Sequence, residues 1–135
     1  MSLMMLAMVF LQSSRAIASA KRINEVMDTR VDLTDEDARD KEKRVEKGRI
    51  EFRNVSFWYY KESQEKVLDN ISLTIEPGET VGVIGSTGCG KTTLVSMIPR
   101  LYDVDEGCIL VDGVDVRDYS LKNLREGVGM VLQKN

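Results

Sequence analysis

The spacing of apolar residues divides the chain into a helical beginning, a charged middle and a remainder that alternates between strands and helices. Residues 3–28 contain no Gly or Pro and are rich in Ala, Leu and Met, which favours a helix. Past Gln12 the apolar side chains of this segment recur at helical spacing. Residues 29–48 are dense in charge and poor in large apolar side chains, a composition typical of a linker.

Four segments of the remainder have the patterns of strands. Apolar and polar residues alternate over residues 50–57, and a second alternating segment covers residues 67–75, so both are expected to be strands. The runs TVGVI at residues 80–84 and VGMVL at residues 128–132 are almost wholly apolar. Short continuous runs of this kind predict strands that are buried on both faces.

Helices and a tight turn are expected between these strands. A helix is predicted over residues 91–101, and one or two helical turns over residues 121–125. Asp112 and Gly113 separate two short apolar runs, at residues 108–111 and 114–116. Because Asp-Gly suits the central positions of a two-residue turn, a β-hairpin is predicted there.

The clearest chemical signal is the string GSTGCGKT at residues 85–92, which fits the phosphate-loop pattern G-x-x-x-x-G-K-[ST]. Glycines let the backbone curl around an anion, and successive N–H groups then point inward. The first turn of the following helix adds unpaired N–H groups. Lys91 supplies a positive charge for the β- and γ-phosphates, and the Thr92 hydroxyl suits Mg²⁺. The string therefore predicts a site for a nucleotide, with a structural glycine-rich turn as the alternative.

Cys89 lies inside this loop, near the start of the predicted helix and two residues before Lys91. Both neighbours favour the thiolate form of a cysteine. We therefore expect a thiol reagent to label Cys89 and MgATP to protect it. The alternative is that Cys89 is an inert small residue that fills a serine-sized space.

Composition and charge limit the kind of site this can be. The net charge of −3 and the pI near 5.1 do not suggest a nucleic-acid binder, which usually has a basic face. The chain has no histidine, so the usual general base and the commonest zinc ligand are missing. Two cysteines, Cys89 and Cys108, do not make a disulfide framework, and a reducing compartment is the simpler interpretation.

Four strings together resemble the first part of an ABC transporter nucleotide-binding domain of the multidrug/lipid exporter type. They are IEFRNVSFWY, VLDNISLTIEPGETVGVIGSTGCGKTTL, IPRLYDVDEGCILVDGVDVRDYSLKNLR and VGMVLQKN, and their order and spacing also match. The resemblance implies an α/β fold: an incomplete phosphate-loop NTPase core of ABC type, with an N-terminal antiparallel β subdomain and a long N-terminal helix.

The N-terminal string SSRAIASAKRINEVMD resembles the end of the last membrane helix and its connector. Leu3–Leu11 is a run of nine apolar residues, far short of the ~20 that span a bilayer. It is either a buried helix or the end of a membrane helix, and the resemblance favours the second. The expected domains are therefore residues 1–28 as membrane-helix end and connector, 29–48 as charged linker, and 49–135 as a truncated nucleotide-binding domain.

The resemblance also assigns roles to single positions. Tyr59 stands where the family places the aromatic residue that stacks on adenine, with Trp58 and Tyr60 as neighbours in the sequence. Gln133 stands at the Q-loop glutamine, an accessory to catalysis, and it is implied with Thr92 for Mg²⁺. The positions implied for ATP binding are Tyr59, Gly85, Ser86, Thr87, Gly88, Cys89, Gly90, Lys91, Thr92 and Thr93.

The implied function is MgATP binding within an ATP-driven exporter at the cytoplasmic face of the cell membrane. Its implied partners are a second nucleotide-binding domain and a transmembrane domain. The signature LSGGQ, an apolar strand ending in Asp-Glu and the switch histidine do not occur in this sequence. We therefore expect no catalytic residue in the chain, which should bind MgATP without hydrolysing it.

Two other functions fit part of the pattern. A small kinase or GTPase would use the same phosphate loop, with Asp112 as its metal aspartate, but no guanine-reading motif or basic lid occurs in the sequence. A non-catalytic or membrane-associated remnant would bind no nucleotide. Tight GTP binding would favour the first alternative, and no response to MgATP would favour the second.

Overall fold

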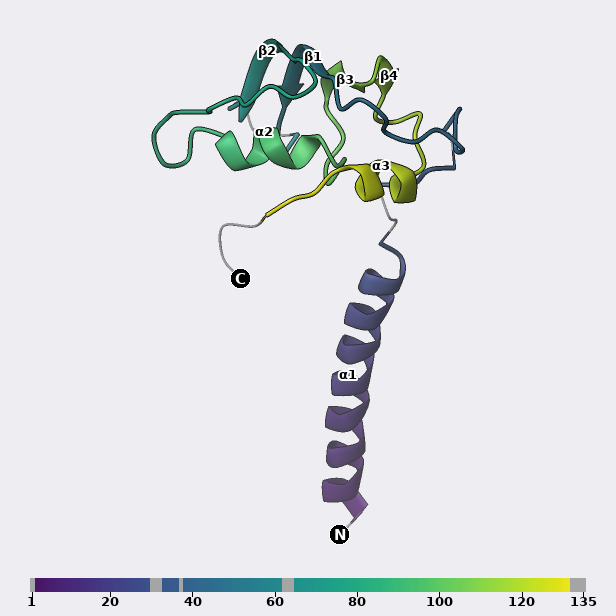
Figure 1. Cartoon of the computed structure of the whole chain (residues 1–135). Coiled ribbons are helices and arrows are strands. Elements are labelled where there is room, and N and C mark those ends of the chain that lie inside the picture. The colour runs from purple at the N-terminus through teal and green to yellow at the C-terminus, as the bar shows by residue number, and fades with distance from the viewer. Residues whose placement is uncertain (1, 30–32, 37, 62–64, 132–135) are drawn as a thin grey trace. The chain divides into compact units, whose positions relative to one another are not determined.

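The computed structural model describes residues 2–29, 33–36, 38–61 and 65–131 of the 135-residue chain (Figure 1). The chain separates into two compact units, Met1–Asp32 and Leu33–Asn135.

In its described residues, the first unit is a single helix. α1 covers Ser2–Met27, which confirms the helix predicted over residues 3–28. The hydroxyls of Ser13 and Ser14 donate to the carbonyl oxygens of Val9 and Phe10, so both are satisfied within the helix. Among the helices that the structure describes, none has both the length and the apolar character needed to cross a membrane.

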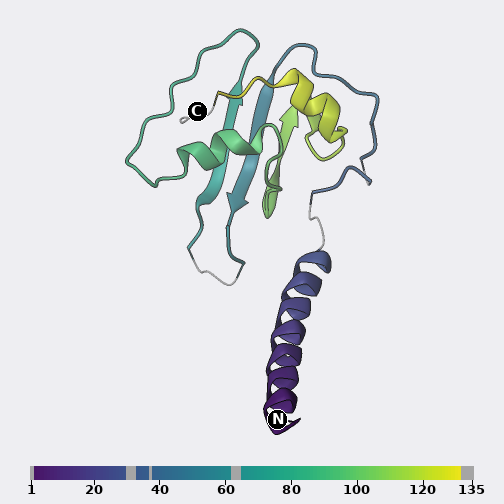
Figure 2. The same cartoon turned by 90° about the horizontal axis from the view of Figure 1, so that it is seen from below.

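The second unit is built on an antiparallel sheet with the strand order β2-β1-β3-β4. Its strands are β1 (Ile50–Phe57), β2 (Leu68–Ile75), β3 (Glu106–Val111) and β4 (Val114–Asp115). Figure 2 shows β2, β1 and β3 side by side. The hairpin between β3 and β4 is confirmed, because Asp112 and Gly113 have φ angles of 50° and 82°, the left-handed geometry of a tight hairpin turn.

Two short helices complete the described part of this unit, and both figures place α2 along one face of the sheet (Figures 1 and 2). They are α2 (Lys91–Met97) and α3 (Leu121–Gly127). The core forms where side chains of the strands meet those of both helices. Its most buried members are Phe52, Val55, Phe57, Leu68, Met97, Ile109, Val111, Val116, Tyr119 and Leu124.

The two apolar runs predicted as buried strands are not strands in the described chain. Residues 80–84 have no regular structure, with Val81 and Val83 nearly half exposed and Ile84 98% exposed. Residues 128–131 likewise form no strand, and Leu132 lies outside the described residues. An apolar run becomes a buried strand only where neighbouring strands satisfy its backbone groups on both sides. The described sheet offers these two runs no such neighbours.

The helix predicted over residues 91–101 ends earlier than expected, at Met97. A turn follows in which Arg100 has a φ of 51° and donates its N–H to the carbonyl of Met97. Pro99 lacks an N–H and cannot continue the helical ladder. The chain therefore leaves α2 in a defined turn rather than in a further helical turn.

Part of the charged segment before β1 packs on the hairpin and on α3. The carboxylate of Asp112 accepts the backbone N–H groups of Glu46, Lys47 and Arg49 at 2.7–2.9 Å. The side-chain amide of Asn123 donates to the carbonyl of Lys41 at 2.8 Å. Residues 41–49 are thus held to the hairpin and α3 of the same unit, one contact at each end of the segment.

Candidate functional site

The glycine-rich loop connects the exposed segment after β2 to the start of α2. Residues 85–89 are exposed, and Gly90 caps the helix with a φ of 88°. A Cβ at Gly90 would lie 2.8 Å from the carbonyl oxygen of Val67. Gly88 also has a positive φ, of 85°. The loop needs glycine at these two positions because its backbone is left-handed at both, and at Gly90 it also approaches Val67 closely.

The Lys91 side chain connects the end of the glycine-rich loop to its beginning. Its Nζ donates to the carbonyl oxygens of Gly85 at 2.9 Å and Ser86 at 2.7 Å, and it lies 3.6 Å from the Sγ of Cys89. The loop therefore wraps around the ammonium group. The ammonium charge of Lys91 is thus paired with carbonyl oxygens of the loop, which a bound anion would have to replace.

The first turn of α2 presents two neighbouring hydroxyls in different environments. Thr92 is exposed, whereas Thr93 is only 6% exposed. Oγ1 of Thr93 lies 3.0 Å from the phenol oxygen of Tyr59, with either atom able to donate. This hydrogen bond connects the phosphate-loop helix to the segment that follows β1.

Tyr59 lies in a cluster of three aromatic rings. Its centroid is 5.0 Å from that of Phe57 and 5.3 Å from that of Tyr102, with interplanar angles of 81° and 88°. These are edge-to-face contacts, a favourable arrangement for aromatic pairs. Tyr59 is nevertheless 48% exposed, so much of its surface remains accessible.

The other aromatic residues near Tyr59 differ from it. Trp58 has the ammonium of Lys66 4.9 Å from its ring centroid. The pKa of Lys66 lies above its ordinary value because the ammonium pairs with the carboxylate of Asp69 and, more weakly, with that of Glu106. Tyr60 is 77% exposed. Of the three consecutive aromatic residues Trp58, Tyr59 and Tyr60, Tyr59 is therefore the one that combines contacts to other aromatic rings with a half-exposed side chain.

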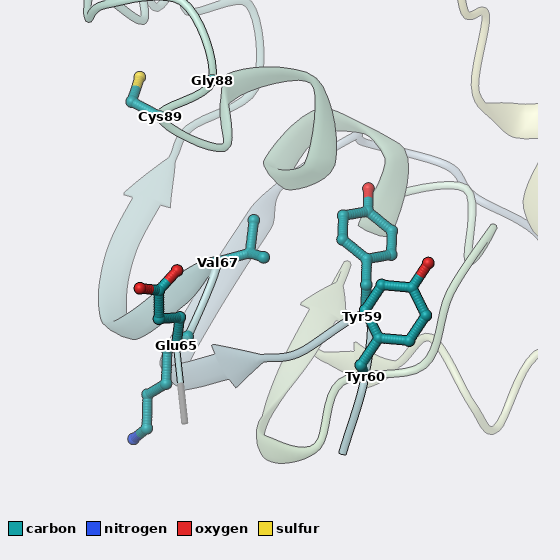
Figure 3. Close-up of a pocket in the computed structure, with 7 residues that line it drawn as sticks. Tyr59, Tyr60, Glu65, Val67, Gly88 and Cys89 are labelled. Carbon is teal, nitrogen blue, oxygen red and sulfur yellow. The ribbon is translucent and has the colours of Figure 1, made fainter. Parts of the chain in front are cut away.

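An open pocket of about 420 Å³ lies between the aromatic residues and the glycine-rich loop (Figure 3). This volume is within the range of small-molecule sites. The residues that line it come from three segments: the residues after β1, the approach to β2, and the loop. They are Tyr59, Tyr60, Glu65, Lys66, Val67, Gly88 and Cys89.

The pocket brings together part of the predicted site. Tyr59 shares it with Gly88 and Cys89 of the loop, whereas Lys91 and Thr92 are not among its lining residues. Gln133 lies outside the described residues. The sequence did not single out Glu65 and Lys66, because nothing in a polar turn indicates that it will face a loop some twenty residues further on.

A magnesium ion would depend on few protein ligands at this site. In the part of the chain that the structure describes, no group of three or more His, Cys, Asp or Glu side chains could hold a metal. Mg²⁺ commonly takes one or two protein oxygens and completes its shell with phosphate oxygens and water. The exposed Thr92 hydroxyl fits that requirement. Asp112, the metal aspartate of the kinase or GTPase hypothesis, instead binds three backbone N–H groups.

Comparison with known proteins finds similar proteins among transporters. The family model described as "ABC transporter" matches residues 68–135. A putative multidrug export ATP-binding/permease protein of Bacillus subtilis is 48% identical over 89% of this chain and 20% of its own length. An ATP-dependent lipid A-core flippase of Aromatoleum aromaticum is 45% identical over 89% of this chain and 19% of its own length. The chain thus spans about a fifth of the length of these curated relatives.

The structure comparison agrees with the sequence comparison. A bacterial Atm1-family ABC exporter, solved with ATP bound, matches with a TM-score of 0.74 and 29% identity over 96% of this chain and 22% of that chain. The match supports the predicted fold class, an incomplete ABC-type α/β fold with an antiparallel sheet and a long N-terminal helix. Since the family model covers half of the chain and includes the whole glycine-rich loop, the chain belongs to the ABC transporter family.

Proposed function

We propose that this chain binds MgATP as the nucleotide-binding part of an ATP-driven exporter. The observation on which this proposal rests is the pocket shared by Tyr59 and by Gly88 and Cys89 of the glycine-rich loop. An aromatic ring at one end suits a planar base, and a backbone rich in N–H groups at the other suits a phosphate chain. A nucleotide has both parts in one molecule.

Each predicted residue has a distinct role in this proposal. Tyr59 stacks on the adenine, and residues 85–90 surround the phosphates with backbone N–H groups. Lys91 exchanges the carbonyls of Gly85 and Ser86 for phosphate oxygens, and Thr93 connects the phosphate-loop helix to Tyr59 through the hydrogen bond between their hydroxyls. Thr92, with Gln133, provides oxygen ligands to Mg²⁺, which neutralises phosphate charge when bound.

The wider role follows from the relatives. Their printed names describe multidrug export and lipid A-core flipping, and we propose that this chain serves a transporter of the same general kind. Its partners would be a second nucleotide-binding domain and a transmembrane domain, at the cytoplasmic face of the cell membrane. Phosphoryl transfer needs a group that orients the attacking water. The apolar strand ending in Asp-Glu and the switch histidine of the family do not occur in this sequence. We therefore propose that the isolated chain binds ATP without turning it over.

Calorimetric titration of the full chain with MgATP tests this function. We expect saturable binding, weakened about tenfold or more in Lys91→Ala because a hydrogen bond to a charged group is lost. Lys122→Ala on α3 is the matched control, since this lysine is 80% exposed and pairs only loosely, at 3.9 Å, with Glu126. Absence of binding, or equal affinity in Lys91→Ala, would refute the proposal. Tighter binding of MgGTP would instead favour the kinase or GTPase hypothesis.

A further inference from the structure

The aromatic cluster around Tyr59 also contains Tyr102, which lies neither in the glycine-rich loop nor next to Tyr59 in the sequence. The ring of Tyr102 lies 5.3 Å from that of Tyr59 at an angle of 88°, and 5.6 Å from that of Phe57 at 48°. Phe57 and Tyr59 belong to the end of β1 and the residues after it, whereas Tyr102 follows α2. The cluster therefore joins two segments that are more than forty residues apart in sequence.

The segment that carries Tyr102 is held firmly on both sides. Before it, Arg100 is 6% exposed and forms a two-bond ion pair with Asp103, at 2.6 and 2.9 Å. The Arg125 side chain adds hydrogen bonds to the carbonyls of Pro99 and Arg100. Tyr102 thus projects from backbone that is fixed by buried and half-buried contacts.

The same segment is tied directly to the residues that carry Tyr59. The N–H of Asp105 donates to the carbonyl of Ser56 at 3.2 Å. The carboxylate of Asp105 accepts the N–H of Trp58 at 2.9 Å. These two bonds bracket the end of β1, so Tyr102 and Tyr59 are held in register as neighbours.

We propose that Tyr102 is a positioning residue for the base-binding ring of Tyr59, an inference that rests on the function proposed above. A half-exposed tyrosine at a strand end loses rotamer freedom when a base stacks on it. A ring already fixed by neighbours loses less, and this preorganisation strengthens binding. Tyr102 supplies an edge-to-face contact while Tyr59 still reaches the pocket.

The two tyrosines that line the pocket differ in this respect. Tyr59 has two ring contacts and a hydrogen bond to Thr93. Tyr60 is 77% exposed, and no ring contact to it is among those found in the described residues. Tyr102 therefore preorganises the ring of Tyr59 and not that of Tyr60. This difference explains why the base stacks on Tyr59 rather than on its neighbour.

The test compares a ligand that has a base with one that lacks it. The full chain is titrated with MgATP and with magnesium tripolyphosphate, in the wild type, Tyr102→Leu, Tyr102→Phe and Tyr59→Leu, and in the double variant Tyr59→Leu/Tyr102→Leu. Tyr102→Leu should weaken MgATP binding roughly three- to tenfold, the range expected for one aromatic pair. Its affinity for magnesium tripolyphosphate should stay at the wild-type value. Tyr102→Phe keeps the ring and should bind MgATP like the wild type.

The double variant separates positioning from general damage. If Tyr102 acts through Tyr59, its removal costs nothing more once Tyr59 is already leucine. Unchanged MgATP affinity in Tyr102→Leu, equal weakening toward both ligands, or full additivity in the double variant would overturn the inference. Each of these results leaves MgATP binding by the wild type intact. Failure of the wild type to bind MgATP would refute the proposed function itself.

Discussion

The phenol oxygen of Tyr59 lies 3.0 Å from Oγ1 of Thr93. One residue belongs to the proposed base site and the other to the first turn of the phosphate-loop helix. The hydrogen bond fixes the distance between the two subsites, because Thr93 is buried and cannot follow a moving side chain. A nucleotide bound at one subsite would therefore find the other already placed.

The hydroxyl and the ring of Tyr59 make separable contributions. Tyr59→Phe removes only the hydrogen bond and should weaken MgATP binding about two- to tenfold, the usual range for one such bond. Tyr59→Leu also removes the stacking surface and should weaken binding roughly tenfold to a hundredfold. Calorimetry gives both affinities. The double variant Tyr59→Phe/Thr93→Val should bind no more weakly than Thr93→Val alone.

Tyr60→Leu is the comparison for these variants, because Tyr60 is adjacent, more exposed and lines the same pocket. Its loss should weaken MgATP binding less than the loss of Tyr59. A larger effect at Tyr60 would reassign the base to that ring.

Cys89 offers a chemical probe of the loop. It is exposed, whereas Cys108 is half-buried on β3, so a colorimetric thiol reagent should modify Cys89 first. MgATP should slow this modification, because phosphates held by the loop would cover its backbone and the adjacent thiol. In Cys89→Ser the remaining labelling belongs to Cys108 and should not respond to MgATP. Labelling of Cys89 at the same rate with and without nucleotide would count against the site.

Two glycines with similar φ angles but different surroundings make a matched pair for stability. A Cβ at Gly90 would lie 2.8 Å from the Val67 carbonyl, whereas one at Gly78 would meet nothing within 4 Å. Gly78→Ala should lower the free energy of unfolding by about 1 kcal/mol, the cost of a left-handed alanine. Gly90→Ala should cost about 2–3 kcal/mol, since steric strain adds to the backbone cost. Denaturant unfolding followed by the fluorescence of Trp58 measures both, and equal costs would contradict the close approach.

The parts of the fold that the sequence predicts are those decided by local pattern. The alternation over residues 50–57 and the Asp112-Gly113 turn can each be recognised within a few residues, and β1 and the β3–β4 hairpin are found there. The run at residues 80–84 is different. A strand made of this run would need neighbouring strands on both sides, and the described sheet has none there. The apolar run therefore forms no strand, although its pattern alone predicts one.

The candidate site, too, has one part that the sequence predicts and another that only the structure shows. The loop at residues 85–92 is visible in the sequence because its chemistry is local: glycines, a lysine and a threonine in fixed order. The contacts of Tyr59 with Tyr102 and Thr93 depend on how β1, α2 and the following turn pack. No spacing along the chain encodes that packing, so Tyr102 could be found only in the structure.

The carboxylate of Asp112 contributes to stability in a way that depends on pH. Burial alone would raise the pKa of this carboxyl group, but the N–H groups of Lys47, Glu46 and Arg49 together hold the pKa below its ordinary value of 3.8. Asp112 has a φ of 50°, which Asn also tolerates. Asp112→Asn therefore keeps the turn and removes the charge, and it should lower the free energy of unfolding near neutral pH by about 1–3 kcal/mol.

The stabilisation by Asp112 should decrease as the pH falls. Because the pKa of Asp112 is lower in the folded chain than in the unfolded chain, its stabilisation is complete above the unfolded pKa and is lost as the pH falls through the folded one. Glu51, whose pKa is held at about 2 by Arg53 and Arg49, titrates in the same acidic range in both proteins and cancels from the difference. The gap between wild type and Asp112→Asn should therefore be constant from about pH 5 to 8 and shrink below about pH 4. A gap that persists unchanged at pH 2 would show that the carboxylate charge does not hold residues 46–49 on the hairpin.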